Sequence, residues 1–324
     1  MNSERGSVAQ AGAGAWGIDG LAVGMWTHPD GHTGTTVLLP PEGTVGAAAV
    51  RGGAPGTREV AALSVHGRIE ACHGIVLSGG SAFGLAAADG AVRWCAEQGI
   101  GHDVGVARVP IIGAAIVFDL RAGDAARPDA DAGYAACAAA APRDPRDGLV
   151  GVGAGCTVGK LAGLAHAVPG GQGAAVRRAA GCTVGALVAV NALGDVLDEQ
   201  GAPLAASTAP ADRPRYPEAG QPRAGTNTVI GCVVTDAALS KADAVRAADL
   251  AHSGVARSVS PAHTSYDGDV LFLLATGRGG GHLDLVADLA ARAVAAAVRA
   301  AVRAGARDAA RREASPPAPS PGCA

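Results

Sequence analysis

Aromatic residues are scarce in this chain of 324 residues: they make up 3% of it, although 48% of its residues are hydrophobic. That apolar content is sufficient for a large core and excludes a disordered or fibrous protein. Because Phe, Trp and Tyr are so few, the core has to be packed closely from Ala, Val, Leu and Gly. The length fits one large domain or two ordinary ones.

The chain also lacks a long uninterrupted hydrophobic run. Its longest apolar stretch, residues 283–304, is interrupted by Asp284, Asp288 and three arginines, so we expect no membrane span. Residues 1–20 lack the apolar core of a signal peptide. The net charge is −3 and no basic run occurs outside the C-terminal tail, which argues against a nucleic-acid partner. We therefore expect a cytoplasmic protein.

Paired metal-ligand motifs are absent from the sequence. It contains no Cys-x-x-Cys pair and no His-Glu-x-x-His motif, and its histidines show no periodic spacing, so we predict no metal and no other cofactor. The cysteines are odd in number and scattered, which indicates buried free thiols in a reducing compartment. They are Cys72, Cys95, Cys137, Cys156, Cys182, Cys232 and Cys323.

Lysine and asparagine are both rare. The chain has two lysines, Lys160 and Lys241, and three asparagines, Asn2, Asn191 and Asn227, although arginine is common. Such a composition fills ordinary surface positions with arginine. A lysine in such a composition indicates a position that needs a compact ammonium group with a tunable pKa. The guanidinium group of arginine cannot replace it there, because it is permanently charged. Lys160, at the end of a glycine-rich segment, is therefore a candidate site residue.

Apolar periodicity predicts alternating strands and helices. Predicted strands cover residues 37–39, 45–50, 74–77, 109–120, 183–192, 229–235 and 270–276, and predicted helices cover 82–98, 240–255 and 283–304, with an Ala-rich helix inside 124–147 and a short helix through Lys160. Residues 201–225 are rich in Pro, Ala and Gly, which is typical of an exposed flexible loop. We expect residues 1–17 to be flexible and the polar, Pro-rich residues 306–324 to be a disordered tail.

Two glycine-rich segments resemble known motifs but lack residues that those motifs require. Residues 79–84 follow a strand, but the nucleophile-elbow pattern needs a final Gly where this chain has Phe83. Residues 154–161 lack the first Gly and the final Ser or Thr of a phosphate loop. Both segments are therefore predicted to be tight turns. The amides of the first turn can still hold an anion or a carbonyl oxygen, and the second can shape a small-molecule pocket.

Asn227 and Thr228 stand where the flexible loop meets a strongly apolar strand. A threonine hydroxyl can attack the preceding carbonyl group and form an ester by an N-to-O acyl shift. Hydrolysis then leaves Thr228 with a free α-amino group, whose reference pKa is about 8. Held beside its own hydroxyl, that amine can act as the general base. The alternative is that Thr228 is an ordinary strand residue, and the residues alone favour that alternative.

Asp267 and Asp269 flank a single glycine before another apolar strand. In an extended chain, residues two apart point to the same face, so the two carboxylates can clamp an ammonium group. Their mutual repulsion would raise the pKa of one of them. Asp-Gly is also a common turn pair, and the two interpretations stand at equal weight.

Six segments together resemble the L-aminopeptidase/D-esterase family of self-processing hydrolases, which also includes β-peptidyl aminopeptidases and nylon-oligomer hydrolases. They occur in the family's order between residues 18 and 302, which is far more specific than any single motif. The segments are RGGAPGTRE (51–59), LSGGSAFGL (77–85), GAGCTVGK (153–160), VNALGD (190–195), TNTVIG (226–231) and PAHTSYDGD (261–269).

The resemblance implies an α+β fold, a four-layer α-β-β-α sandwich of the N-terminal-nucleophile-hydrolase type. It implies one hydrolase domain over residues 18–305, cleaved between Asn227 and Thr228 into a heavy part (18–227) and a light part (228–305) that stay together. It also suggests a homo-oligomer, a tetramer of processed units.

Carried over by position, Thr228 matches the family's nucleophile, and a polar site surrounds it. We infer that Asn191 donates to the oxyanion, that Lys160 adds positive charge near the hydroxyl and that the aspartates orient the amine and bind a substrate ammonium. The residues that match the surrounding polar site are Lys160, Asn191, Asp267 and Asp269.

Three further residues, Gly80, Ser81 and Phe118, are expected to contact the substrate. Some aminopeptidase members carry a Tyr where this chain has Phe118, so any function of that phenol is absent here. Several members use Ser as the nucleophile, whereas Thr228 adds a methyl group that restricts its rotamers. Both departures bear on substrate preference.

The leading hypothesis is therefore an amidohydrolase or aminopeptidase that cleaves short peptides or amides with a free amine end through an acyl-enzyme on Thr228. Alternatives are a polyamide (nylon) oligomer hydrolase and an acyltransferase with the same type of site. A non-catalytic binding protein on the same scaffold is a further alternative, and the joint presence of Lys160, Asn191 and Asp269 argues against it.

Overall fold

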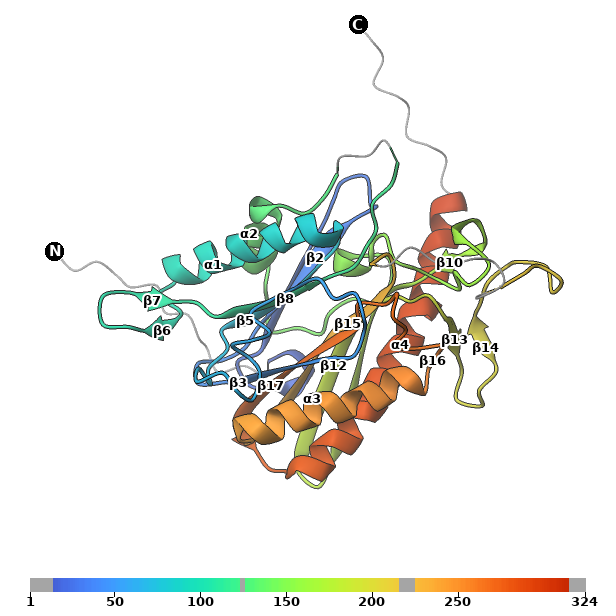
Figure 1. Cartoon of the computed structure of the whole chain (residues 1–324). Coiled ribbons are helices and arrows are strands. Elements are labelled where there is room, and N and C mark those ends of the chain that lie inside the picture. The colour runs from blue at the N-terminus through green and yellow to red at the C-terminus, as the bar shows by residue number, and fades with distance from the viewer. Residues whose placement is uncertain (1–13, 123–125, 216–224, 315–324) are drawn as a thin grey trace, which may run out of the picture.

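Four layers follow one another through the protein, whose computed structural model describes residues 14–122, 126–215 and 225–314. Helices α1 and α2 cover one five-stranded sheet, a second five-stranded sheet lies against its other face, and helices α3 and α4 cover the far side (Figure 1). The predicted α-β-β-α sandwich is confirmed. The helices are α1 (Ala87–Glu97), α2 (Ala130–Ala138), α3 (Lys241–Ala256) and α4 (Leu283–Ala314).

The first sheet has the strand order β1-β2-β5-β8-β4, and the second has the order β11-β12-β15-β17-β3. The strands of the first are β1 (Ala22–Thr27), β2 (Gly34–Leu39), β5 (Gly74–Ser78), β8 (Ile112–Ile116) and β4 (Thr57–Arg58). The strands of the second are β11 (Gly171–Ala179), β12 (Cys182–Asn191), β15 (Thr228–Ala237), β17 (Val270–Gly279) and β3 (Val45–Val50).

Each sheet has one parallel pair of strands joined by a helix on its outer face. In the first sheet β5 and β8 are parallel and α1 lies between them in the chain. In the second, β15 and β17 are parallel and are joined through α3, while β12 and β3 pair antiparallel on either side of them. The amino-terminal ends of β15 and β17 therefore meet at the same edge of the second sheet.

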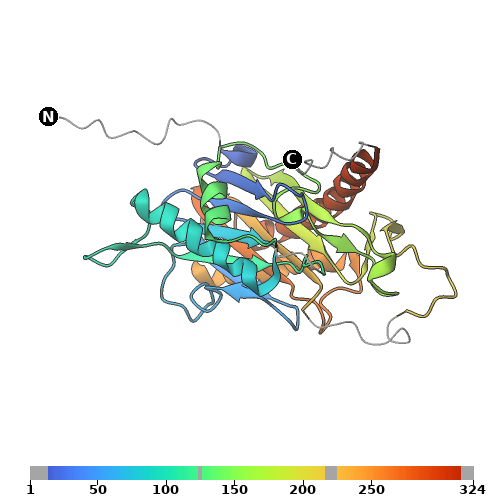
Figure 2. The same ribbon diagram turned by 90° about the horizontal axis from the view of Figure 1, so that it is seen from above.

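Short elements connect the layers. Figure 2, seen from above, shows the β6–β7 hairpin extending beyond the sandwich at the end of α1. The short strands are β6 (His102–Asp103), β7 (Arg108–Val109), β9 (Thr157–Val158), β10 (Val168–Pro169), β13 (Asp195–Leu197), β14 (Pro203–Ala205) and β16 (Val259–Ser260). The 3-10 helices are η1 (Ala15–Gly17), η2 (Ser81–Ala86), η3 (Gly151–Gly153) and η4 (Leu164–His166).

The core is built mainly from small aliphatic residues, as the composition predicts. Phe272 is fully buried between the two sheets with Leu187 and Ile230. On the outer side, α4 lies directly on the backbone of β11: a Cβ atom at Gly173 would come within 2.1 Å of the carbonyl oxygen of Ala297. Glycine at this position therefore permits a close approach between helix and sheet that a larger residue would prevent.

Two predicted boundaries are wrong. Helix α4 continues through Gly305 to Ala314, so residues 306–314 are helical and do not belong to a disordered tail. Gly305 is buried against Gly170, and the Ala- and Arg-rich sequence after it has a high helix propensity. At the other end, residues 14–17 are ordered and Trp16 is buried. Residues 1–13 and 315–324 lie outside the described residues.

Some predicted elements also differ. Lys160 lies in a turn after β9 and not in a helix, because the glycines around it direct the chain into a short strand and a turn. The strand predicted over 109–120 is limited to Ile112–Ile116. Strands β1 and β11 were not predicted. In the described parts of the chain, no helix has the combination of length and hydropathy that crossing a membrane requires.

Candidate active site

The predicted site residues meet at the edge of the second sheet where β12 ends and β15 and β17 begin. Asn191, the last residue of β12, pairs with Thr228, the first residue of β15. Asn227 forms an isolated parallel bridge with Asp267, just before β17. All of these side chains are buried, and so are those of Lys160 and Asp269. Residues from four distant parts of the sequence thus form one polar cluster.

The hydroxyl group of Thr228 lies against the carbonyl group of Asn227. Its Oγ1 atom donates a hydrogen bond to the Asn227 carbonyl oxygen. The backbone N–H of Gly268 donates to the same oxygen at 2.9 Å. A donor on the carbonyl oxygen stabilises the negative charge that develops when a nucleophile attacks the carbonyl carbon. The contact therefore suits attack by Thr228 on the bond that precedes it.

Lys160 is held beside these residues by oxygen acceptors. Its Nζ atom donates to the backbone oxygen and to the Oδ1 atom of Asn191, both at 2.9 Å, and to the carbonyl oxygen of Thr226 at 3.4 Å. Burial lowers the pKa of Lys160 to about 7, although the nearby Cys156 and Asp267 act in the opposite direction. A substantial fraction of this amine is therefore neutral at pH 7 and can accept a proton.

The orientation of the Asn191 side chain is fixed by its partners. Its Oδ1 atom accepts from the backbone N–H of Thr157 at 3.0 Å as well as from Lys160. Its Nδ2 atom therefore faces the other way and donates to the carbonyl oxygens of Phe118, at 2.9 Å, and Thr226, at 3.3 Å. One amide donor is thus directed at the chain segment that precedes Thr228.

The two aspartates hold the backbone around the site. Oδ1 of Asp269 accepts from the backbone N–H of Val229 at 2.6 Å, next to Thr228. Asp267 accepts from the backbone and the hydroxyl of Thr264. Burial raises the pKa of Asp267, and repulsion from Asp269 raises it further.

His263 completes the aspartate cluster, although its residue type and spacing alone did not mark it as a site residue. Its Nδ1 atom lies 2.7 Å from Oδ2 of Asp269. Burial lowers the pKa of His263, but the hydrogen bond and the charge of Asp269 outweigh burial, and the pKa is raised overall. The clue in the sequence was its position inside the segment 261–269, together with both aspartates.

A cavity of about 560 Å³ opens beside the cluster. Its wall includes Phe118, Lys160 and Asn227, and several of its other lining residues are aliphatic. Thr228 is 2% exposed and is not on this wall. The Thr228 side chain is therefore closed off from the cavity, whose wall includes the preceding residue, Asn227.

The structure places Gly80 and Ser81 behind this wall and not on it. The Gly80 N–H donates to Oδ1 of Asp119 at 2.6 Å, and the Ser81 N–H donates to the carbonyl oxygen of Val117 at 2.9 Å. Asp119, which the sequence analysis did not select, lines the cavity and is 8% exposed. Burial raises its pKa to about 6.

The described residues include no cluster of metal-ligating side chains, and their cysteines are buried. Across 14–122, 126–215 and 225–314, no group of three His, Cys, Asp or Glu side chains is arranged to hold a metal ion. Six cysteines within these ranges are buried free thiols. Burial raises the pKa of Cys156, which interacts electrostatically with Lys160, so its thiolate is disfavoured.

Comparisons with known proteins identify the family of the chain. The model of peptidase family S58 matches residues 17–313. A protein of Mycobacterium tuberculosis (strain H37Rv) described as an uncharacterized aminopeptidase is 46% identical over 286 residues, covering 80% of each chain. A 6-aminohexanoate-oligomer endohydrolase of Paenarthrobacter ureafaciens is 31% identical over 269 residues, covering 79% of this chain and 73% of the relative.

Solved structures show the same fold. The L-aminopeptidase D-Ala-esterase/amidase of Ochrobactrum anthropi, described as a variant of the Ntn-hydrolase fold, superimposes with a TM-score of 0.68 at 19% sequence identity. The match covers 92% of this chain and 88% of that one. At this identity the likeness concerns the fold alone.

Proposed function

The chain belongs to peptidase family S58, a family of peptide and amide hydrolases, and we propose that its nucleophile is Thr228, freed by cleavage of the chain's own Asn227–Thr228 bond. One observation carries the proposal. The Thr228 hydroxyl contacts the Asn227 carbonyl group, and the Gly268 N–H donates to the same carbonyl oxygen.

Self-cleavage proceeds in two steps. Neutral Lys160 accepts the hydroxyl proton as Oγ1 of Thr228 attacks the carbonyl carbon of Asn227. The C–N bond then breaks, the nitrogen takes up a proton and an ester joins the two residues. Water hydrolyses that ester, leaving a carboxylate on Asn227 and a free amine on Thr228.

Cleavage also creates the substrate site. When Thr226 and Asn227 move away, Thr228 is uncovered next to the cavity and the Nδ2 group of Asn191 loses one acceptor. This donor is then available to the carbonyl oxygen of a substrate, as an oxyanion hole requires. The free amine of Thr228 serves as the base, its hydroxyl attacks the substrate carbonyl, and water releases the acyl group.

Denaturing mass spectrometry of the purified protein tests self-cleavage. We expect two fragments that divide between Asn227 and Thr228 and an intact chain for Thr228→Ala. Thr226→Ala, which changes a hydroxyl two residues earlier in the same segment, is the control and should still be cleaved. An intact wild-type chain with full amidase activity would refute the proposal.

The substrate class proposed is short peptides or amides with a free amine end, consistent with the name of the mycobacterial relative. A second candidate is a polyamide oligomer, because a relative 31% identical is named for hydrolysis of 6-aminohexanoate oligomers and the cavity has several aliphatic residues. A panel of α- and β-amino-acid amides, esters and 6-aminohexanoate oligomers distinguishes the two. An added amine acceptor shows whether the acyl group goes to water or is transferred.

A further inference from the structure

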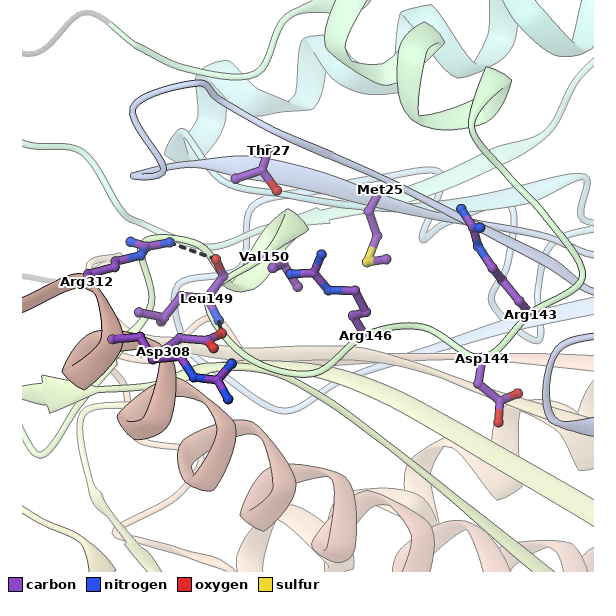
Figure 3. Close-up of a pocket in the computed structure, with 10 residues that line it drawn as sticks. Met25, Thr27, Arg143, Asp144, Arg146, Leu149, Val150, Asp308 and Arg312 are labelled. Atoms are coloured by element: carbon purple, nitrogen blue, oxygen red, sulfur yellow. Dashed lines mark hydrogen bonds between the residues drawn. The ribbon is translucent and has the colours of Figure 1, made fainter. Parts of the chain in front are cut away.

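A second cavity, of about 800 Å³, lies apart from the proposed active site. It is bounded by β1, by the loop before η3 and by the C-terminal part of α4, and Figure 3 shows the residues that line it. None of the residues assigned to the proposed catalytic site is on its wall. Four of its lining residues are arginines: Arg143, Arg146, Arg311 and Arg312.

The acidic residues of this cavity are engaged by the backbone. Oδ1 of Asp144 accepts from the N–H of Trp16 at 2.6 Å, and Oδ2 of Asp308 accepts from the N–H of Leu149 at 3.0 Å. Two aspartates therefore face four arginines, so the wall is positively charged although the whole chain has a net charge of −3.

The arginines differ in how they are held. Arg312 is anchored because its two terminal nitrogens donate to the carbonyl oxygens of Gly31 and Leu149, each at 3.0 Å. The guanidinium groups of Arg143 and Arg146 make no hydrogen bond or ion pair with any described residue. Both side chains are exposed, and their charges are free to meet an anion from solution.

The charges are spread along the cavity. In Figure 3, Arg146 lies between Arg312 and Arg143. Arg143 and Arg146 are three residues apart in a loop that contains Pro145, a separation that an extended chain spans in about 10 Å. An extended anion can contact guanidinium groups that follow one another along the cavity in this order.

We propose that this cavity is a binding site for a linear oligophosphate anion. Guanidinium groups form paired, charge-assisted hydrogen bonds with phosphate oxygens, and an oligophosphate carries negative charge along its whole length. Successive phosphates would lie against Arg312, Arg146 and Arg143. None of the described residues that line the cavity has an aromatic ring to stack on a nucleobase, so recognition is of the phosphate chain.

Isothermal titration calorimetry with tripolyphosphate, orthophosphate and citrate at equal ionic strength tests the proposal. Ionic strength has to be matched because salt screens exposed charges. We expect tripolyphosphate to bind at least tenfold more tightly than orthophosphate or citrate. The double variant Arg143→Gln, Arg146→Gln should weaken its binding at least tenfold.

Arg68→Gln is the matched control, because Arg68 is exposed, makes no hydrogen bond or ion pair with a described residue and does not line this cavity. It should bind tripolyphosphate as the wild type does. Absence of binding, citrate binding as tight as tripolyphosphate binding, or an equal loss in Arg68→Gln would overturn the proposal. A change in oligomeric state of the double variant without loss of binding would instead make this surface a contact between subunits and would also overturn it.

Discussion

Lys160 shows how the environment of one residue sets its chemistry. Its amine is buried and surrounded by carbonyl and amide oxygens, and burial lowers its pKa to about 7. An arginine there would stay charged at any physiological pH, and its planar group would not fit the acceptors that a compact ammonium satisfies. The rarity of lysine in the sequence was therefore a useful signal.

We predict that self-cleavage speeds up as the pH rises through about 7. Lys160 loses its proton over that range, and the neutral amine is the form that accepts the Thr228 proton. Lys160→Arg removes this base, and we expect cleavage to slow by about 100-fold or more. Time courses of freshly synthesised protein on denaturing gels at pH 6, 7 and 8 measure both effects.

Lys241→Arg is the control for this substitution. Lys241 is also buried, and its Nζ atom donates to the carbonyl oxygens of Ala62 and Gly67, each at 2.7 Å, far from Thr228 in the fold. It should leave the cleavage rate and its pH dependence unchanged. Wild-type cleavage in Lys160→Arg, or a rate that falls as the pH rises, would contradict the role of Lys160.

Gly268 is a second residue whose identity matters for the site. A Cβ atom at this position would come within 2.7 Å of the Ala54 carbonyl oxygen and 3.1 Å of Oγ1 of Thr228. We predict that Gly268→Ala displaces the N–H that donates to the Asn227 carbonyl and slows self-cleavage at least tenfold, which is about 1.4 kcal/mol in activation free energy.

Gly280→Ala is the matched control, because the nearest atom to its added Cβ is 3.9 Å away. Both variants should be compared by mass spectrometry for cleavage and by thermal unfolding for stability. If Gly268→Ala is cleaved at the wild-type rate, the Gly268 N–H does not assist the reaction.

At the residue scale, the sequence was most informative where a side chain carries the chemistry. Lys160, Asn191 and Thr228 belong to recognisable segments, and the structure brings them together with the two aspartates. The Gly268 N–H was not predicted because a main-chain donor leaves no side-chain pattern. Asp119 was also missed, because its burial arises from contacts that are distant in the sequence.

At the scale of elements, the central strands were predicted well because each contains a run of apolar residues. Strand β11, which lacks such a run, was not predicted. Strands β12, β15 and β17 are rich in Val, Leu and Ile and were found. Strand β11 reads Gly-Gln-Gly-Ala-Ala-Val-Arg-Arg-Ala, and its glycines mark the place where α4 lies on its backbone. Helix α4 was predicted to end at residue 304, directly before Gly305, but Gly305 is a packing contact inside the helix.

The contact between α4 and β11 yields a stability prediction. In Gly173→Ala the new Cβ would lie 2.1 Å from the Ala297 carbonyl oxygen and 2.4 Å from the Ala301 N–H, which are backbone atoms that cannot move separately from the helix. We expect a loss of about 1–3 kcal/mol in the free energy of unfolding, as for other overpacked cores. Urea denaturation measures it, and a loss no larger than that of Gly280→Ala would show that α4 can shift at little cost.

At the scale of the whole molecule, the proposed cleavage breaks one peptide bond, but strands of both fragments remain paired in the second sheet. Strands β15 and β17 follow the cleavage point, and they lie in the middle of the second sheet between β12 and β3, which precede it. Helix α4 packs on β11 and β12 of the other fragment. Hydrogen bonds and buried apolar contacts on both sides therefore join the two fragments.

We accordingly predict that residues 1–227 and 228–324, expressed together from separate genes, assemble into a stable complex. The first fragment lacks two of the five strands of the second sheet and the second fragment lacks the other three. Each alone exposes unpaired strand edges, so it should be insoluble or aggregate. Copurification through a tag on one fragment, followed by size-exclusion chromatography, measures assembly without depending on self-cleavage. If the two fragments separate under native conditions, the interleaved sheet is not sufficient to hold the processed protein together. If the complex forms and hydrolyses amides once the initiating methionine before Thr228 is removed, self-cleavage is needed only to free the amine of Thr228.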